Sequence, residues 1–130
     1  MSAAALLDLA RAWMRAFNAH DVDALVALYA DGATHTSPKI RALHPDTGGK
    51  LVGKAALGAW WRDANARLPN LRYEESALTA DASTGAGPAA GDGRVFVEYV
   101  RHAPNEPPMP VAEVFEVRGG KIVASRVYHG

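Results

Sequence analysis

The C-terminal part of the chain alternates between residues suited to the two faces of a sheet, and this pattern constrains the fold more than any other sequence feature. Residues 109–118 alternate strictly, and residues 121–129 form a second strand-like segment. Gly119 and Gly120 separate the two segments, and a Gly-Gly pair suits the positive φ angles of a two-residue hairpin turn. The pattern therefore predicts two antiparallel strands joined by a tight turn.

Helices precede the strands along the chain. Apolar residues at helical spacing predict helices over residues 3–19, 22–29 and 53–68, with Asp21 as the N-cap of the second helix and Gly32 as its end. Residues 33–37, 71–80 and 94–102 are predicted strands, and residues 39–50 and 81–93 are predicted loops. Helices first and strands later favour an α+β fold, in which a curved antiparallel sheet wraps against the helices and encloses a pocket.

Size, charge and composition exclude several classes of protein. The 130 residues suit one domain, 1–130, and the 14 basic and 14 acidic residues cancel, which argues against nucleic acid as a partner. Cysteine is absent and no metal-ligand spacing occurs, so we expect neither a metal nor another cofactor. No segment approaches the ~20 apolar residues of a membrane span. The N-terminal run at residues 3–7 lacks the basic start of a signal peptide, so we expect no membrane partner and a cytoplasmic location.

Glu113 is the most informative residue of the predicted hairpin. It shares a strand face with three apolar residues, Val111, Phe115 and Val117. Loss of hydration in such a row would raise the pKa of an acid, which could then donate a hydrogen bond or act as a base near neutral pH. The alternative is that Glu113 lies exposed at a sheet edge or pairs with an arginine.

Two histidines and a serine are further candidates. His35 and Ser37 share a face of the first predicted strand, but no nucleophile motif surrounds the serine. His129 shares a face of the last strand with Ser125 and Val127, and the pattern alone does not tell which face is the inner one. For this next-to-last residue the alternative is a frayed, exposed end.

Large rings on two predicted helices suit either a core or a pocket. Trp13, Trp60 and Trp61 are the three tryptophans of the chain. Packing into the core is the simpler explanation, whereas a pocket for a flat hydrophobic ligand is the functional one.

Three segments of the chain resemble the nuclear transport factor two-like superfamily, and within it the branch of SnoaL-like and ketosteroid isomerase-like proteins. These segments are FNAHDVDALVALYADGATHTSP, GKAALGAWW and VAEVFEVRGGKIVASRVYHG. The resemblance implies a cone-shaped barrel, made of a curved mixed or antiparallel sheet packed on three N-terminal helices, with an internal pocket. It also implies a homodimer through the outer sheet face. Trp13, His35, Ser37, Trp60, Glu113, Ser125 and His129 would then point inward, with the long loop and His44 near the pocket mouth.

The known activities of that branch do not carry over residue by residue. In ketosteroid isomerases a carboxylate base works with a tyrosine and a protonated aspartate. Those positions fall at Ser37, Trp13 and Glu113, so only the acid is kept. The aspartate of the SnoaL-like cyclases falls at Val127.

The sequence therefore predicts a pocket for a small hydrophobic molecule, with acid–base isomerase or cyclase chemistry on a carbonyl compound. Either Trp13 or Ser37 would donate a hydrogen bond to the developing oxyanion. The alternative is a non-catalytic ligand-binding or accessory dimeric module. The facing of Glu98 and His102 stays open. The expected catalytic residues are Glu113, His129 and His35, and the expected pocket residues are Trp13, Phe17, Ser37, Trp60, Phe115, Ser125 and Val127.

Overall fold

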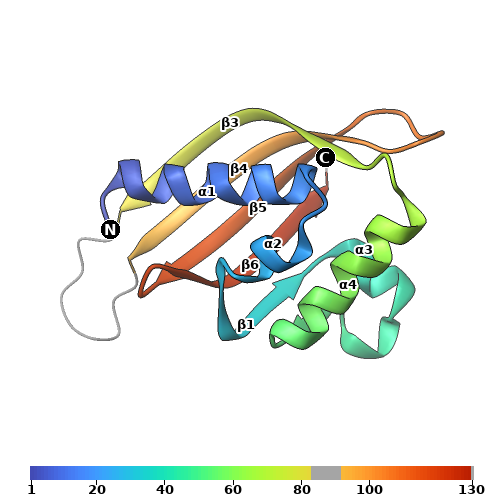
Figure 1. Cartoon of the computed structure of the whole chain (residues 1–130), viewed down its shortest axis with the longest axis horizontal. Coiled ribbons are helices and arrows are strands. Elements are labelled where there is room, and N and C mark those ends of the chain that lie inside the picture. The colour runs from blue at the N-terminus through green and yellow to red at the C-terminus, as the bar shows by residue number, and fades with distance from the viewer. Residues whose placement is uncertain (83–91, 130) are drawn as a thin grey trace.

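A curved sheet with helices on its concave side forms the frame of the molecule (Figure 1). The computed structural model describes residues 1–82 and 92–129. Its helices are α1 (Ala3–Asn18), α2 (Val22–Val26), α3 (Pro38–Leu43) and α4 (Lys54–Arg67), with a 3-10 turn at Pro45–Thr47. Its strands are β1 (Tyr29–Thr36), β2 (Lys50–Val52), β3 (Arg72–Ala82), β4 (Gly93–His102), β5 (Met109–Arg118) and β6 (Lys121–His129).

The strands are ordered β2-β1-β6-β5-β4-β3, and every neighbouring pair is antiparallel except the parallel pair β1 and β6. The α+β class and the mixed, curved sheet are therefore confirmed. The cone is open, because the short strand β2 and the long strand β3 lie at the two edges and do not pair with each other. Helix α1 packs against β3 and β4, and α4 packs against β1.

The C-terminal hairpin forms as predicted. Arg118 pairs with Lys121 across a turn in which Gly119 and Gly120 have φ angles of 61° and 75°. Both angles lie in the left-handed region, which a side chain disfavours. Because the register of this hairpin is fixed, the alternate residues of β5 that include Glu113 all face the core.

Aromatic rings form the centre of the core. Trp13 of α1 is 1% exposed, and its ring centroid lies 4.9 Å from that of Phe115 and 5.5 Å from that of Phe17. The ring of Tyr73 stacks on Phe17 at 3.8 Å and on Tyr99 at 4.1 Å. These contacts join the first helix to the inner face of the sheet.

The second helix is shorter than predicted. It ends at Val26, and Tyr29 begins β1 instead of completing the apolar stripe of the helix. Tyr29 is fully buried, and its hydroxyl bonds to groups on α1 and β6, so tertiary contacts override the helical spacing. Gly32 therefore lies within β1 and does not cap the helix.

The predicted loop at residues 39–50 is also wrong. Its residues form α3, the 3-10 turn and the start of β2. Ser37 caps α3 by accepting a hydrogen bond from the Lys39 amide at 3.1 Å, and Pro38 occupies the first turn, where its missing N–H costs nothing. Proline ends the strand as expected, but it also starts a helix.

Three residues of the predicted loop at residues 81–93 belong to strands. Asp81 and Ala82 belong to β3 and Gly93 to β4, while residues 83–91 lie outside the described part of the chain. Within the described residues, no helix is both long and apolar enough to cross a membrane.

Candidate functional site

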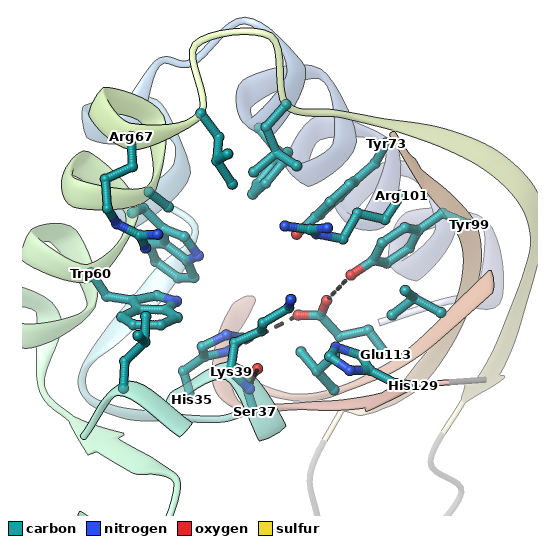
Figure 2. A pocket seen from close by; sticks show the side chains of 18 of the residues that line it. His35, Ser37, Lys39, Trp60, Arg67, Tyr73, Tyr99, Arg101, Glu113 and His129 are labelled. Atoms are coloured by element: carbon teal, nitrogen blue, oxygen red, sulfur yellow. Dashed lines mark hydrogen bonds and ion pairs between the residues drawn. The ribbon is translucent and has the colours of Figure 1, made fainter. Parts of the chain in front are cut away.

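A cavity of about 330 Å³ lies between the concave face of the sheet and the helices (Figure 2). Its wall includes residues of α1, α3, α4 and the five strands other than β2. The volume is at the lower end of the range for small-molecule sites, roughly 300–1,000 Å³. The cavity therefore suits a small ligand.

Glu113 is the buried acid of this cavity. Its side chain projects from the middle of β5 and is 1% exposed. The hydroxyl of Tyr99, on the neighbouring strand, donates a hydrogen bond of 2.8 Å to Oε1. Oε2 has no hydrogen-bond partner among the described residues, and it lies 4.0 Å from Nδ1 of His35. A buried polar atom without a partner is rare and points to a functional role.

Burial changes the protonation of this acid. The apolar surroundings raise the pKa of Glu113 to about 8, although the hydrogen bond from Tyr99 favours the charged form. The pKa of Tyr99 is itself raised well above its ordinary value by burial, so Tyr99 stays protonated and remains a donor. At neutral pH most of the Glu113 carboxyl groups therefore carry a proton.

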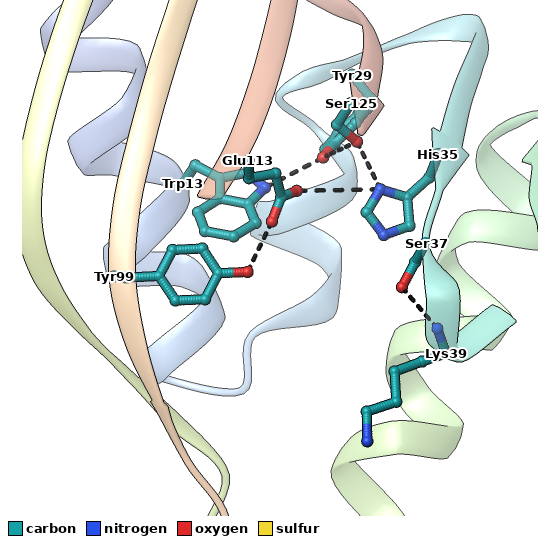
Figure 3. A network of polar contacts seen from close by, with 8 residues as sticks. All are labelled: Trp13, Tyr29, His35, Ser37, Lys39, Tyr99, Glu113 and Ser125. Atoms are coloured by element: carbon teal, nitrogen blue, oxygen red, sulfur yellow. Dashed lines mark hydrogen bonds and ion pairs between the residues drawn. The ribbon is translucent and has the colours of Figure 1, made fainter. Parts of the chain in front are cut away.

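A chain of hydrogen bonds holds His35 in place (Figure 3). Trp13 Nε1 donates to the Tyr29 hydroxyl at 3.1 Å, and this hydroxyl lies 3.0 Å from Ser125 Oγ. Ser125 Oγ in turn lies 2.6 Å from His35 Nδ1. The four residues come from α1, β1 and β6, so the chain links one helix to two paired strands.

The donor at the start of the chain fixes the direction of every bond. An indole nitrogen can only donate, so the Tyr29 oxygen accepts, and its hydrogen must be donated to Ser125. Reversal would leave the buried Tyr29 hydrogen without an acceptor, at a cost of roughly 1–3 kcal/mol. Ser125 then donates to Nδ1, which makes His35 a neutral ring with its hydrogen on Nε2.

Burial also keeps His35 neutral, because it lowers the pKa of this histidine to about 4. Between about pH 4 and pH 8, His35 and Glu113 are therefore both uncharged in most molecules. The 4.0 Å approach of Glu113 Oε2 to His35 Nδ1 is thus a contact of two neutral groups and not an ion pair.

The cavity opens between α3, the end of α4 and the turn after β4, where Leu43, Arg67 and Glu106 are lining residues that solvent also reaches. At this opening, Nη1 of Arg101 donates a hydrogen bond of 2.9 Å to Oε1 of Glu106. Lys39 of α3 also lines the wall. Burial and the nearby charges of Lys39 and Arg101 lower the pKa of His129.

Most of the residues predicted for the pocket line this cavity, but two do not. Phe115 lies behind the ring of Trp13, and Ser125 is fully buried beneath His35. The sequence predicted that Trp13 or Ser37 donates to an oxyanion, but the indole N–H of Trp13 is bound to Tyr29 and is not available for this role. The predicted residues in the wall are Glu113, His35, His129, Trp13, Phe17, Ser37, Trp60 and Val127.

Three further residues do not line the cavity. The facing of Glu98 and His102 was left open by the sequence, and His44 was expected near the pocket mouth. Glu98 is exposed on the outer face, and His102 makes a 3.0 Å contact with Glu74 there. The His44 ring packs edge-on against Trp60 at 6.0 Å but is not part of the cavity wall.

Sequence reasoning missed several residues of the site. Tyr99 and Arg101 lie on β4, whose facing depends on a register that the sequence does not reveal, although the alternation of Val95, Val97 and Tyr99 is a usable signal. Tyr73 is positioned by Asn18, whose side-chain amide exchanges two hydrogen bonds with the Tyr73 backbone, of 2.7 and 2.8 Å. No sequence signal indicates this long-range pair.

The described residues of the cavity wall include groups that can take up and release a proton. They contain no group of three or more histidine or acidic side chains arranged to hold a metal ion. The cavity instead brings together a carboxyl group with a free oxygen, a neutral imidazole and several aromatic rings. Such an arrangement can bind an apolar ligand and exchange a proton with it.

Comparisons with known proteins agree with this architecture. A family model described as "SnoaL-like domain" matches residues 10–125. The structure resembles a SnoaL-like protein of unknown function from Burkholderia thailandensis, with 29% identity, a TM-score of 0.80, and coverage of 99% of this chain and 97% of the other. A protein of unknown function with a cystatin-like fold, from Methylobium petroleophilum, has 23% identity and a TM-score of 0.76, with coverage of 100% and 78%. A protein with a ketosteroid isomerase-like fold from Catenulispora acidiphila, in complex with trimethylamine, has 21% identity and a TM-score of 0.64, with coverage of 92% and 83%. No curated protein matches the chain.

Proposed function

The chain belongs to the SnoaL-like domain family, and from this premise we propose that it is an acid–base enzyme of the isomerase or cyclase type. Its substrate is a small hydrophobic carbonyl compound bound in the cavity. Because this fold hosts many activities, the proposal rests on the site and not on the family.

The free oxygen of Glu113 is the observation that carries the proposal. One carboxyl oxygen is held by Tyr99, and the other has no partner among the described residues, although the group is almost completely buried. The raised pKa of about 8 allows this carboxyl group to take up and release a proton near neutral pH. A structural acid would instead be satisfied by an arginine or by backbone amides.

In the proposed reaction Glu113 is the base and His35 is a hydrogen-bond donor. Glu113 in its ionised form removes a proton from the carbon next to the carbonyl group, which leaves an enolate. The Nε2–H of His35 and the hydroxyl of Ser37 donate hydrogen bonds to the enolate oxygen. The proton then returns from Glu113 to the substrate, at the same carbon or at another one.

Exchange of hydrogen for deuterium at the α-carbon of a bound ketone tests this proposal. Acetophenone is incubated with the protein in D₂O, and the methyl signal is followed by proton NMR. We expect Glu113→Gln to slow the catalysed exchange by on the order of 10²-fold. The matched control is Glu116→Gln, which removes an acid that binds Arg126 away from the cavity. Unchanged exchange in Glu113→Gln would remove Glu113 from the mechanism.

The second candidate function is a non-catalytic binding module. It is favoured by the resemblance described above, which places Ser37 and Val127 at positions where ketosteroid isomerases and SnoaL-like cyclases carry acidic residues. If the ketone binds but exchanges no faster than in buffer, the protein is a binder and the cavity serves recognition alone.

We also propose that the outer sheet face forms a homodimer interface. Phe96 on β4 and Tyr128 on β6 lie on this face and are 41% and 54% exposed. Large exposed rings of this kind are typical of surfaces that bind another protein.

A further inference from the structure

The opening of the cavity differs in charge from its interior. The interior is lined by aromatic rings and by Glu113 and His35, which are both uncharged in most molecules at neutral pH. Lys39 and Arg101 reach into the same cavity from opposite sides, from α3 and from β4 (Figure 2). The cavity therefore has a neutral, ring-lined part and a cationic part.

Among the described residues that line the cavity near its opening, the positive charges exceed the negative charges. Arg101 is 8% exposed, and its single carboxylate partner among the described residues is Glu106. Arg67 pairs with Asp63 at 2.8 Å. Lys39 has no carboxylate within ion-pair distance in the described part of the chain. Among the described residues, one positive charge thus remains uncompensated in a partly enclosed site.

The geometry of Arg101 suits a ligand with two oxygens. Glu106 occupies one terminal nitrogen of the guanidinium group, and the group has five N–H donors in total. Burial in β4 and the bond to Glu106 hold the planar group in one orientation, which lowers the entropy lost when a ligand binds. An ammonium group and a fixed guanidinium group together are the usual partners of a carboxylate.

We propose that Lys39 and Arg101 form a subsite for a carboxylate group of the ligand, on the side of the cavity next to its opening. The substrate class is then a small carboxylic acid with an apolar body and a carbonyl group. This inference rests on the proposed function, because the carbonyl group is assigned from Glu113. His129, close to both cations, completes the polar side of the subsite.

A pair of probes that differ only in charge tests the subsite. The para-acetylbenzoate anion carries a carboxylate and a ketone on one ring, and para-acetylbenzamide is its neutral counterpart. Dissociation constants are measured by isothermal titration calorimetry at low and at high salt. We expect the carboxylate to bind about tenfold tighter than the amide, or more, and salt to weaken only the carboxylate.

The variant Lys39→Met keeps the length of the side chain and removes its charge. It should lower the affinity for the carboxylate by about tenfold and leave the affinity for the amide within about twofold. The control variant Lys50→Met removes the same charge from an exposed position on β2 outside the cavity and should change neither affinity. If Lys39→Met does not fold, the salt dependence of the unmodified protein and the variant Arg101→Gln give the same test.

The outcomes separate the subsite from the proposed reaction. Equal binding of the two probes, or an equal loss of both in Lys39→Met, would overturn the carboxylate subsite and leave the reaction standing. Tight, salt-sensitive binding of the carboxylate, with no catalysed deuterium exchange of acetophenone, would support the subsite and contradict the reaction. If neither probe binds, both proposals fail.

Discussion

At the scale of single residues, Glu113 and His35 oppose each other in their effect on stability. Glu113 binds its proton more tightly in the folded protein, where its pKa is about 8, than in the unfolded chain, where the ordinary value is 4.5. Its stabilising contribution is therefore complete below pH 4.5 and is lost as the pH rises to 8. His35, with a pKa lowered from 6.5 to about 4, contributes fully above pH 6.5 and loses its contribution as the pH falls to 4.

This opposition predicts a specific pH dependence. Of Glu113 and His35, only Glu113 differs between the folded and unfolded states in its number of bound protons from pH 6.5 to 8. Over this interval the free energy of unfolding should fall by about 2 kcal/mol because of Glu113, and Glu113→Gln should remove that fall. Urea unfolding at several pH values measures it. The control Glu116→Gln should keep the slope, and a Glu113→Gln variant with the slope of the unmodified protein would contradict a raised pKa.

At the scale of elements, α1 is joined to β3 by the side chain of Asn18. Its amide makes both a donor and an acceptor bond to the Tyr73 backbone. The ring of Tyr73, between Phe17 and Tyr99, lines the cavity. One exposed amide thus sets the position of an aromatic wall.

Asn18→Ala should therefore lower the free energy of unfolding by about 1–2 kcal/mol, because it removes two hydrogen bonds. It should also weaken ligand binding, since the wall that carries Tyr73 loses its attachment to α1. Urea unfolding and calorimetric titration measure the two effects. Asn70→Ala, at an exposed turn position, is the control and should change stability by less than about 0.5 kcal/mol. If Asn18→Ala changed neither the free energy of unfolding nor ligand binding, packing alone would hold the wall that carries Tyr73.

The elements that were predicted correctly are those with a strong local pattern. Residues 53–68 have helical spacing with a proline stop, and β5 and β6 have alternation with a glycine turn, so local and tertiary preferences agree there. The second helix and residues 39–50 were wrong because buried contacts of Tyr29 and the capping geometry at Ser37 decide these segments. Local spacing carries no information about either contact.

The residues of the candidate site also differ in whether a local sequence pattern predicts them. Burial of Glu113 follows from the apolar neighbours on its own strand, so the sequence contains the signal. Its partner Tyr99 and the cation Arg101 lie on β4, and their place in the cavity depends on the pairing of β4 with β5. Pairing between strands is a long-range property, and a single sequence does not specify it.

At the scale of the whole molecule, the outer sheet face should join two copies of the chain. The mass in solution, measured by light scattering after size exclusion, should be twice 13.8 kDa. Phe96→Glu should give the mass of one chain, because the introduced carboxylate would lose its hydration in the interface without gaining a partner. Val52→Glu, at an exposed position on the edge strand β2, is the control. A single-chain mass for the unmodified protein would contradict the interface.

The hydrogen-bond chain behind His35 has a consequence for how the site exchanges protons with water. It begins at Trp13, whose indole nitrogen has no lone pair to accept a proton. Protons therefore cannot be conducted to solvent through Trp13. A proton on Glu113 can therefore reach bulk solvent through the opening but not along this wall. A ligand that fills the opening would isolate the proton inside with it. For such a ligand, unlike the smaller acetophenone, turnover in deuterated water would return much of the original hydrogen to the product, as an intramolecular transfer.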